Sequence, residues 1–274
     1  MSSISDQNYL LSSQYKTADN LNARIRLHEL YSTNKYGWFR WLFHQLDLPE
    51  RARVLEVGCG PGTLWEENLT RMPQDWEVVL TDLSPGMVEE ARANLEGAEG
   101  FSFQQADAMS LPFPDESFDG VLAMYMLYHV PDRSKALAEM RRVLKAEGKL
   151  YVSTLGRMHL YEIFEMLDRF DPVAAARLPF GPATTDTQEH RLGFVLETGG
   201  EEIARHFSHV ELLRYEDSLE VTEARPLIDY ILSSSGSVFD TDQTQALAAF
   251  VQAELDANGP LHIRKDNGLF VARR

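Results

Sequence analysis

The spacing of hydrophobic and polar positions changes twice along the chain. Over the first 50 residues, apolar and aromatic side chains recur at helical spacing, which predicts helices near 20–31 and 36–46. From residue 53, short apolar runs rich in β-branched residues alternate with helical segments. After residue 154 this regularity weakens. The pattern therefore predicts an N-terminal helical segment, a regular α/β core and a less regular remainder.

The core segment reads as repeated strand and helix units. The strand-like runs are "RVLEVG", "EVVLTD", "FSFQQAD", "FDGVLAMY" and "GKLYVST", and helices are expected from about Thr63, from Pro85 and from about Asp132. Strands that alternate with helices in this way predict βαβ units on a parallel sheet with helices on both faces.

The remainder carries further elements. Helical spacing continues in "MHLYEIFEMLDRF", the Pro and Gly of "DPVAAARLPFGP" predict a break, and a helix in "TQEHRLGFVLETGG" is expected to stop at Gly199. Extended structure is expected in "VELLRYEDSLEV" and "LHIRKDNGLFVARR", which would complete the same sheet.

Charge and composition narrow the partners and the compartment. The 274 residues carry a formal net charge of −16, so phosphate backbones and anionic membranes would be repelled; nucleic acid and membrane are not expected as partners. Cys59 is the one cysteine, which excludes an internal disulfide, and it is expected to pack beneath a loop rather than to react. No signal-peptide pattern opens the sequence, and a cytoplasmic setting is predicted.

The stretch "VLEVGCGPGTLW" joins the first core strand to a glycine loop with Gly58, Gly60 and Gly62. A dinucleotide fingerprint would place its third glycine at Thr63, and it binds a pyrophosphate that the carboxylate of Glu56 would repel. S-adenosylmethionine instead has an ammonium and a sulfonium and no phosphate, so Glu56 would complement it. An NAD-dependent oxidoreductase with the same fold remains the alternative.

Two more carboxylates end the next strands. Asp82 closes "EVVLTD", where an acidic residue accepts hydrogen bonds from ribose hydroxyls, and Asp107 closes "FSFQQAD". Asp107 is expected either to accept from an adenine amino group, beside the backbone N–H of Ala108, or to be only a turn residue. Three acids would thus share the carboxyl edge of the sheet.

Successive motifs carry a family resemblance. "VLEVGCGPG", "LTDLSPGMVEEA", "QADAMSLPFPDESFDGVLAMYMLYHV" and "RVLKAEGKLYVST" resemble those of class I S-adenosylmethionine-dependent methyltransferases, in particular the branch similar to the ubiquinone/menaquinone-biosynthesis enzymes. The resemblance implies a Rossmann-like, doubly wound α/β sheet of seven strands, the last antiparallel. The cofactor set carried over from it is Glu56, Gly58, Gly60, Gly62, Asp82, Leu83, Met87, Asp107, Ala108 and Met124.

The expected organisation follows from the extent of these motifs. Residues 1–50 would form an N-terminal helical cap and residues 51–274 the methyltransferase domain. Within that domain, 51–155 would bind the cofactor, 156–208 would be a helical insertion that caps the substrate, and 209–274 would complete the sheet with its helices.

Methyl transfer from a sulfonium is an in-line displacement with an activated donor, so positioning is the main requirement. His129 is the candidate general base, with Tyr125 a weaker one; His129 as a brace for its loop is equally compatible with the sequence. Candidates for the substrate side are Tyr15, Tyr36, Trp38 and His159.

The histidines show no metal-ligand spacing, so no metal is expected. The acceptor is expected to be a small molecule; a cofactor-binding protein without catalysis is the third possibility, and the sequence does not define the oligomeric state.

Overall fold

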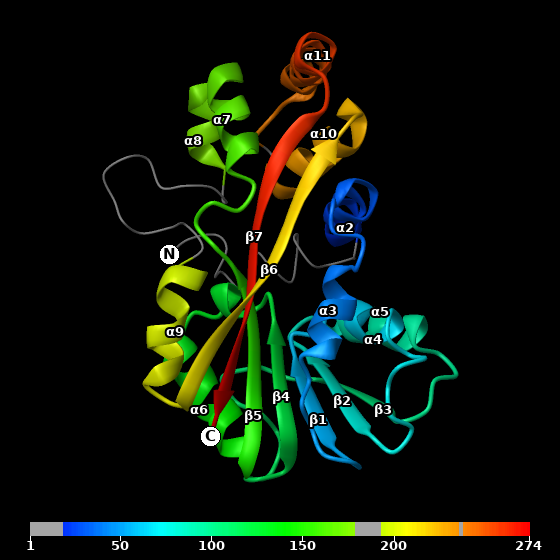
Figure 1. Ribbon diagram of the computed structural model, residues 1–274, viewed down its shortest axis with the longest axis vertical. Helices are drawn as coiled ribbons and strands as arrows, with labels where there is room; N and C mark the ends of the chain where they lie inside the picture. The colour runs from blue at the N-terminus through cyan, green and yellow to red at the C-terminus, as the bar shows by residue number, and fades with distance from the viewer. Residues whose placement is uncertain (1–18, 179–192, 236–237) are drawn as a thin grey trace.

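One seven-stranded sheet organises the protein (Figure 1), for which the computed structural model describes residues 19–178, 193–235 and 238–274. The strand order is β3-β2-β1-β4-β5-β7-β6; the first five strands are parallel, and β7 is antiparallel to both of its neighbours. The predicted Rossmann-like sheet with an antiparallel last strand is confirmed. The strands are β1 (Arg53–Val57), β2 (Glu77–Asp82), β3 (Phe101–Gln105), β4 (Phe118–Met124), β5 (Leu144–Leu155), β6 (Ser208–Val221) and β7 (Leu261–Arg273).

Helices cover both faces of this sheet, as the crossovers require. One apolar cluster joins the sheet to α6 (Arg133–Val143) and α9 (Leu196–Ala204), and another joins it to α3 (Trp38–His44), α4 (Thr63–Glu66) and α5 (Pro85–Asn94). Alternation along β1 explains the two layers, because Val54 packs into the second cluster and Leu55 into the first.

The last two strands continue past the others as a two-stranded arm. β5 pairs with β7 only as far as Asn267, whereas β6 and β7 pair with each other up to Val221 and Leu261. A third apolar cluster coats this arm with the helices of the upper half of Figure 1. These are α2 (Asp19–Tyr31), α7 (Tyr161–Phe170), α8 (Pro172–Arg177), α10 (Ala224–Ser235) and α11 (Thr241–Asn258). We call the arm with these helices the cap; it stands at the carboxyl edge of the parallel strands.

Two local predictions need correction. The chain does break at Pro172, between α7 and α8, but the sequence did not predict the helix α8 that follows. Asp171 is the N-cap of α8 and accepts hydrogen bonds from the N–H groups of Val173 and Ala174, both at 3.0 Å. α9 does not stop at Gly199, where a Cβ would lie 2.9 Å from the Phe194 ring; the glycine allows that close packing inside the helix. The earlier part of that predicted helix, residues 187–192, lies outside the described residues.

The division of the domain stays a prediction. The apolar clusters, however, do not group the helices of the segment 156–208 together. Within 156–208, α7 and α8 pack in the cap, while α9 packs on the core sheet. The apolar cluster of the cap also contains α2 from the N-terminal segment, and α10, α11 and the arm from 209–274.

Candidate cofactor and acceptor site

A cavity of about 510 Å³ opens between the carboxyl edge of the sheet and the cap. The loops after β1, β2, β3 and β4 form one end, and α2, the start of α7 and the arm form the other. Most of the sequence-predicted residues line it: Glu56, Gly58, Gly60, Asp82, Leu83, Met87, Asp107, Ala108, Met124, Trp38, Tyr125, His129 and His159. The structure thus brings together the ends of four successive strands, as expected for this edge of an open α/β sheet.

Two of the predicted residues that the structure describes do not join them. Gly62 is the N-cap of α4, at φ 80°, and is not part of the cavity wall. Tyr36 is also absent from the wall: its ring is exposed, its hydroxyl lies 3.0 Å from Nδ1 of His44, and Arg40 stacks on it. The structure therefore does not bring Tyr36 to the cavity. Tyr15 lies outside the described residues.

Glu56 sits at the end of β1 and is almost fully buried. The indole N–H of Trp65, on α4, donates to its Oε2 over 2.6 Å. Burial raises the pKa of Glu56 to about 8, the Trp65 hydrogen bond opposes that rise, and the neighbouring Asp82 adds to it. Glu56 is therefore largely protonated at neutral pH until a cation approaches it, which the sequence did not predict.

Asp82 holds the glycine loop and faces the same cavity. Its Oδ2 accepts from the N–H of Gly60 at 3.0 Å, and its Oδ1 accepts from the N–H of Ser84 at 2.8 Å. Burial raises the pKa of Asp82, against the effect of these backbone donors. The short strand-to-helix turn thus fixes the carboxylate at the edge of the cavity.

Gly58 shows why the loop is rich in glycine. It adopts φ +73°, and a Cβ there would lie 2.8 Å from Cβ of Met126 in the loop after β4. Cys59, beside it, is buried, and burial raises the pKa of its thiol well above the ordinary range, so this cysteine packs beneath the loop as expected.

Asp107 forms a turn and also faces the cavity. Its Oδ1 accepts from the N–H of Met109 at 2.9 Å. A turn role and a ligand role are compatible here, because a carboxylate has two oxygens, each with two lone pairs.

Trp38 and Tyr125 build an aromatic wall where α3 meets the loop after β4. Their ring centroids lie 5.4 Å apart, and Tyr125 adopts φ 51°. Burial raises the pKa of the Tyr125 hydroxyl well above its ordinary value, so it does not act as an ionised base. His129 lies in the short 3₁₀ helix η3 (Leu127–His129), lines the cavity and packs against Tyr128 with centroids 4.5 Å apart.

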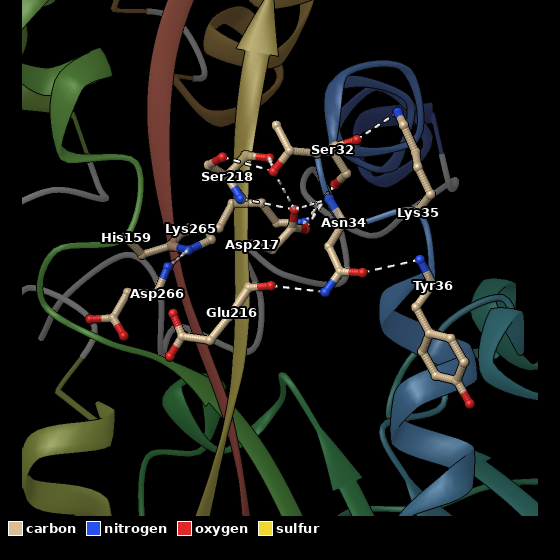
Figure 2. A network of polar contacts seen from close by, with 11 residues as sticks. Ser32, Asn34, Lys35, Tyr36, His159, Glu216, Asp217, Ser218, Lys265 and Asp266 are labelled. Atoms are coloured by element: carbon tan, nitrogen blue, oxygen red, sulfur yellow. Dashed lines mark hydrogen bonds and ion pairs between the residues drawn. The ribbon is translucent and has the colours of Figure 1, made fainter.

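The opposite end of the cavity has polar residues that sequence reasoning did not select. Figure 2 shows the ammonium of Lys265 on the arm, which pairs with Asp217 and donates to Oγ of Ser32 at 2.8 Å. Burial alone would raise the pKa of Asp217, but Lys265 and the backbone N–H of Asn34 more than offset it, and the pKa is lowered. Burial also lowers the pKa of Lys265.

His28 and His159 lie beside this ion pair, with ring centroids 6.1 Å apart. Nδ1 of His159 accepts from the backbone N–H of Asp266 at 3.2 Å, which fixes that ring to the arm (Figure 2). His28 lines the cavity and is partly exposed, while its Nδ1 atom is buried. Burial, with the charge of Lys265, lowers the pKa of His28 to about 3, so it is neutral at physiological pH.

Comparison with known proteins assigns part of the sequence to a family. Residues 55–152 match the methyltransferase domain family. This segment therefore forms a methyltransferase domain, and its sheet has the Rossmann-like arrangement of class I. The chain is 33% identical over 136 aligned residues to the ubiquinone/menaquinone biosynthesis C-methyltransferase UbiE of Proteus mirabilis. The aligned region covers 48% of this chain and 54% of that protein. The chain thus spans about half the length of that curated relative.

Solved structures share the fold of the methyltransferase domain. The YcgJ protein of Bacillus subtilis has a TM-score of 0.58 at 19% identity, over 86% of this chain and 97% of that chain. Phosphoethanolamine N-methyltransferase 2 of Haemonchus contortus, solved with S-adenosylmethionine, has a TM-score of 0.57 at 19% identity, over 98% of this chain and 59% of that chain. The family match ends at β5, before most of the cap.

Proposed function

We propose that the protein is an enzyme that transfers a methyl group from S-adenosylmethionine to a small-molecule acceptor. The observation that carries the proposal is the convergence of Glu56, Asp82 and Asp107, from the ends of successive strands, on one cavity. Three carboxyl groups suit a ligand that carries a cationic group and hydroxyls, because Glu56 ionises beside a cation, whereas a pyrophosphate would find no cationic partner among them.

The residues present fit that cofactor. Glu56 would ionise beside its ammonium, Asp82 would accept from its ribose hydroxyls, and Asp107 would accept from its adenine amino group. Met87 and Met124 add apolar surface to the same wall. When bound, the cofactor would supply an activated methyl group: the acceptor's nucleophile would bond to the methyl carbon, and the carbon–sulfur bond would break with its electron pair kept by sulfur.

The chain's own contribution to the displacement would be to position and enclose the acceptor. Alignment of two reactants is able to supply about 7–11 kcal/mol of the barrier. The cap leaves a cavity of limited size over the carboxyl edge, which suits a small molecule better than a folded protein. His129 would take the proton of a hydroxyl or an acidic carbon, and an acceptor that is already nucleophilic would need no base.

Two further observations support a small acceptor. The curated relatives include C-methyltransferases of ubiquinone and menaquinone biosynthesis, whose products are small molecules. The net charge of −16 disfavours nucleic acid. None of the described helices is long and apolar enough to cross a membrane, and the cytoplasmic setting stays a prediction.

Calorimetric titration with S-adenosylmethionine, S-adenosylhomocysteine and NAD tests the proposal. Both adenosyl ligands should bind with micromolar affinity and NAD should not. Asp82→Ala should weaken both by about 10-fold to 100-fold, since a hydrogen bond to a charged group contributes about 1.5–3 kcal/mol. Asp75→Ala, at an exposed position, is the matched control and should bind as the wild type does. Binding of NAD alone would favour the oxidoreductase alternative.

Turnover separates an enzyme from a protein that only retains the cofactor. Formation of S-adenosylhomocysteine in the presence of an acceptor panel, above the rate without acceptors, would establish catalysis. Tight cofactor binding with no acceptor-dependent product across the panel would support the binding protein instead.

A further inference from the structure

Unpartnered buried polar atoms gather on one wall of the cavity. Among the described residues, five buried side-chain polar atoms lack a hydrogen-bond partner, and three of them belong to residues that line this cavity. These three atoms are Nδ1 of His28, Nε1 of Trp38 and Oδ1 of Asn267. A buried polar atom without a partner costs the free energy of its lost hydration, so such a concentration indicates a ligand that supplies the partners.

The three residues belong to one continuous strip. Asn267 pairs directly with Tyr215 across the arm, so the two side chains share a face, and the Trp38 ring packs on Tyr215 with centroids 5.4 Å apart. Lys265 lies two positions before Asn267 in β7 and points to the same face.

The strip reaches α2 through that lysine. Lys265 donates to Ser32, which directly follows α2 (Figure 2). The charge of Lys265 also acts on His28, one helical turn earlier. We call His28, Trp38, Lys265 and Asn267 the polar strip.

The atoms of the strip define what a partner must offer. The amide oxygen of Asn267 accepts hydrogen bonds and the indole N–H of Trp38 only donates, while Nδ1 of the neutral His28 accepts or donates according to its tautomer. A carboxylate has no hydrogen for the amide oxygen of Asn267. An ammonium has no lone pair for the indole N–H of Trp38.

A hydroxyl group meets both demands, because it donates one hydrogen bond and accepts others. The neighbouring wall is apolar, with Ile25, Leu155 and Phe164 facing the same cavity. The ion pair with Asp217 already balances the charge of Lys265, so the strip has no net charge to offer an ionic ligand.

We propose that the polar strip binds the methyl acceptor, and that this acceptor is an uncharged, mainly apolar small molecule with at least one hydroxyl group. The inference rests on the proposed function and goes beyond it by naming the class of acceptor and the residues that select it. His28, Trp38 and Asn267 would contact the hydroxyl groups of the acceptor, and the cofactor would occupy the opposite end of the cavity.

The test compares three probes that share one apolar frame: 1-naphthol, 1-naphthoate and 1-naphthylmethylammonium. Each is titrated calorimetrically into the protein saturated with S-adenosylhomocysteine. 1-Naphthol should bind at least tenfold more tightly than either charged probe. His28→Leu should weaken 1-naphthol about tenfold, His28→Asn should recover part of the loss because its amide offers an acceptor, and neither should change the affinity for S-adenosylhomocysteine.

His262→Leu is the matched control, since His262 is exposed on the arm and alternates to the face opposite Lys265. A second readout needs no altered histidine. The indole N–H resonance of Trp38, assigned by its loss in Trp38→Phe, should shift when 1-naphthol is added to the wild type.

The outcomes distinguish a failure of the proposed function from a failure of the acceptor site. If S-adenosylhomocysteine does not bind, the proposed function fails and this inference falls with it. If S-adenosylhomocysteine binds, the inference alone is overturned by any of three results: a charged probe that binds as tightly as 1-naphthol, no detectable 1-naphthol binding, or a Trp38 resonance that does not move.

Discussion

The ionisation of Glu56 makes cofactor binding depend on pH in a defined direction. Burial raises the pKa of this carboxyl to about 8, above its value in an unfolded chain, so the native protein without ligand holds a proton there at neutral pH. Its contribution to the free energy of unfolding is fully present below the unfolded pKa and is lost as the pH rises through about 8. An ammonium placed beside Glu56 lowers that pKa again, so binding should release a proton and strengthen as the pH rises.

The magnitude follows from the fraction of Glu56 that is ionised before the ligand arrives. With a pKa of about 8, this fraction is about 1% at pH 6, about 9% at pH 7 and about half at pH 8. The association constant for S-adenosylhomocysteine should therefore rise about 50-fold between pH 6 and pH 8. At pH 7, about 0.9 proton should be released for each ligand bound.

Calorimetry at pH 6, 7 and 8, in buffers of different ionisation enthalpy, measures both quantities. Glu56→Gln keeps the shape of the side chain and an oxygen for the Trp65 N–H, but it carries no titrating proton. Its binding should be weak at every pH and should change less than threefold over this range. A wild-type affinity that is constant within threefold, or an equally steep pH dependence in Glu56→Gln, would refute the assignment of the ammonium to Glu56.

Three further changes test the packing around the site. Asp217→Leu leaves Lys265 buried without its partner and should lower the free energy of unfolding, measured by urea denaturation, by about 3–5 kcal/mol. The double variant Asp217→Leu with Lys265→Met should have a free energy of unfolding close to that of the wild type. Equal losses in the single and double variants would contradict this expectation. Gly58→Ala forces an alanine into φ +73° at about 1–2 kcal/mol, in addition to the overlap it creates, so an unchanged melting temperature would show that the loop relaxes freely. Trp65→Phe removes the donor to Glu56 and should move the pH dependence of S-adenosylhomocysteine binding to higher pH; a shift to lower pH would count against the hydrogen bond.

The cofactor end of the site follows from sequence because its determinants are local. Each carboxylate closes a strand, and the carboxyl ends of neighbouring parallel strands meet at one edge, so their order along the chain predicts their proximity. The state of Glu56 did not follow, because the donor that holds it, Trp65, is placed by the turn between β1 and α4.

The cap end depends on contacts between distant segments. His28 and Lys265 come together only when α2 packs on the arm, more than 200 residues later in the chain. A signal was present: in β7, Lys265 and Asn267 occupy the same alternate positions as the buried Ile263 and Leu269, so two polar residues face the interior. When the alternation of buried and exposed positions along β7 is followed through Lys265 and Asn267, it predicts a buried polar site.

Tyr36 shows that two residues close together in sequence need not belong to the same site. It lies two positions before Trp38, yet Trp38 begins α3 and faces the cavity while Tyr36 remains exposed outside the helix. Aromatic content alone did not distinguish them. Asp171 and Pro172 separate two helices, because a proline that ends one helix also suits the first position of the next, and the pattern did not predict α8 itself.

A crystal structure of the protein with S-adenosylhomocysteine would show where the cofactor binds. The ligand should fill the cavity at the carboxyl edge, with its ammonium at Glu56, its ribose hydroxyls at Asp82 and its adenine amino group at Asp107. The space beside the polar strip should stay open for an acceptor. A ligand bound elsewhere, or in this cavity without contact to Glu56 and Asp82, would contradict this placement.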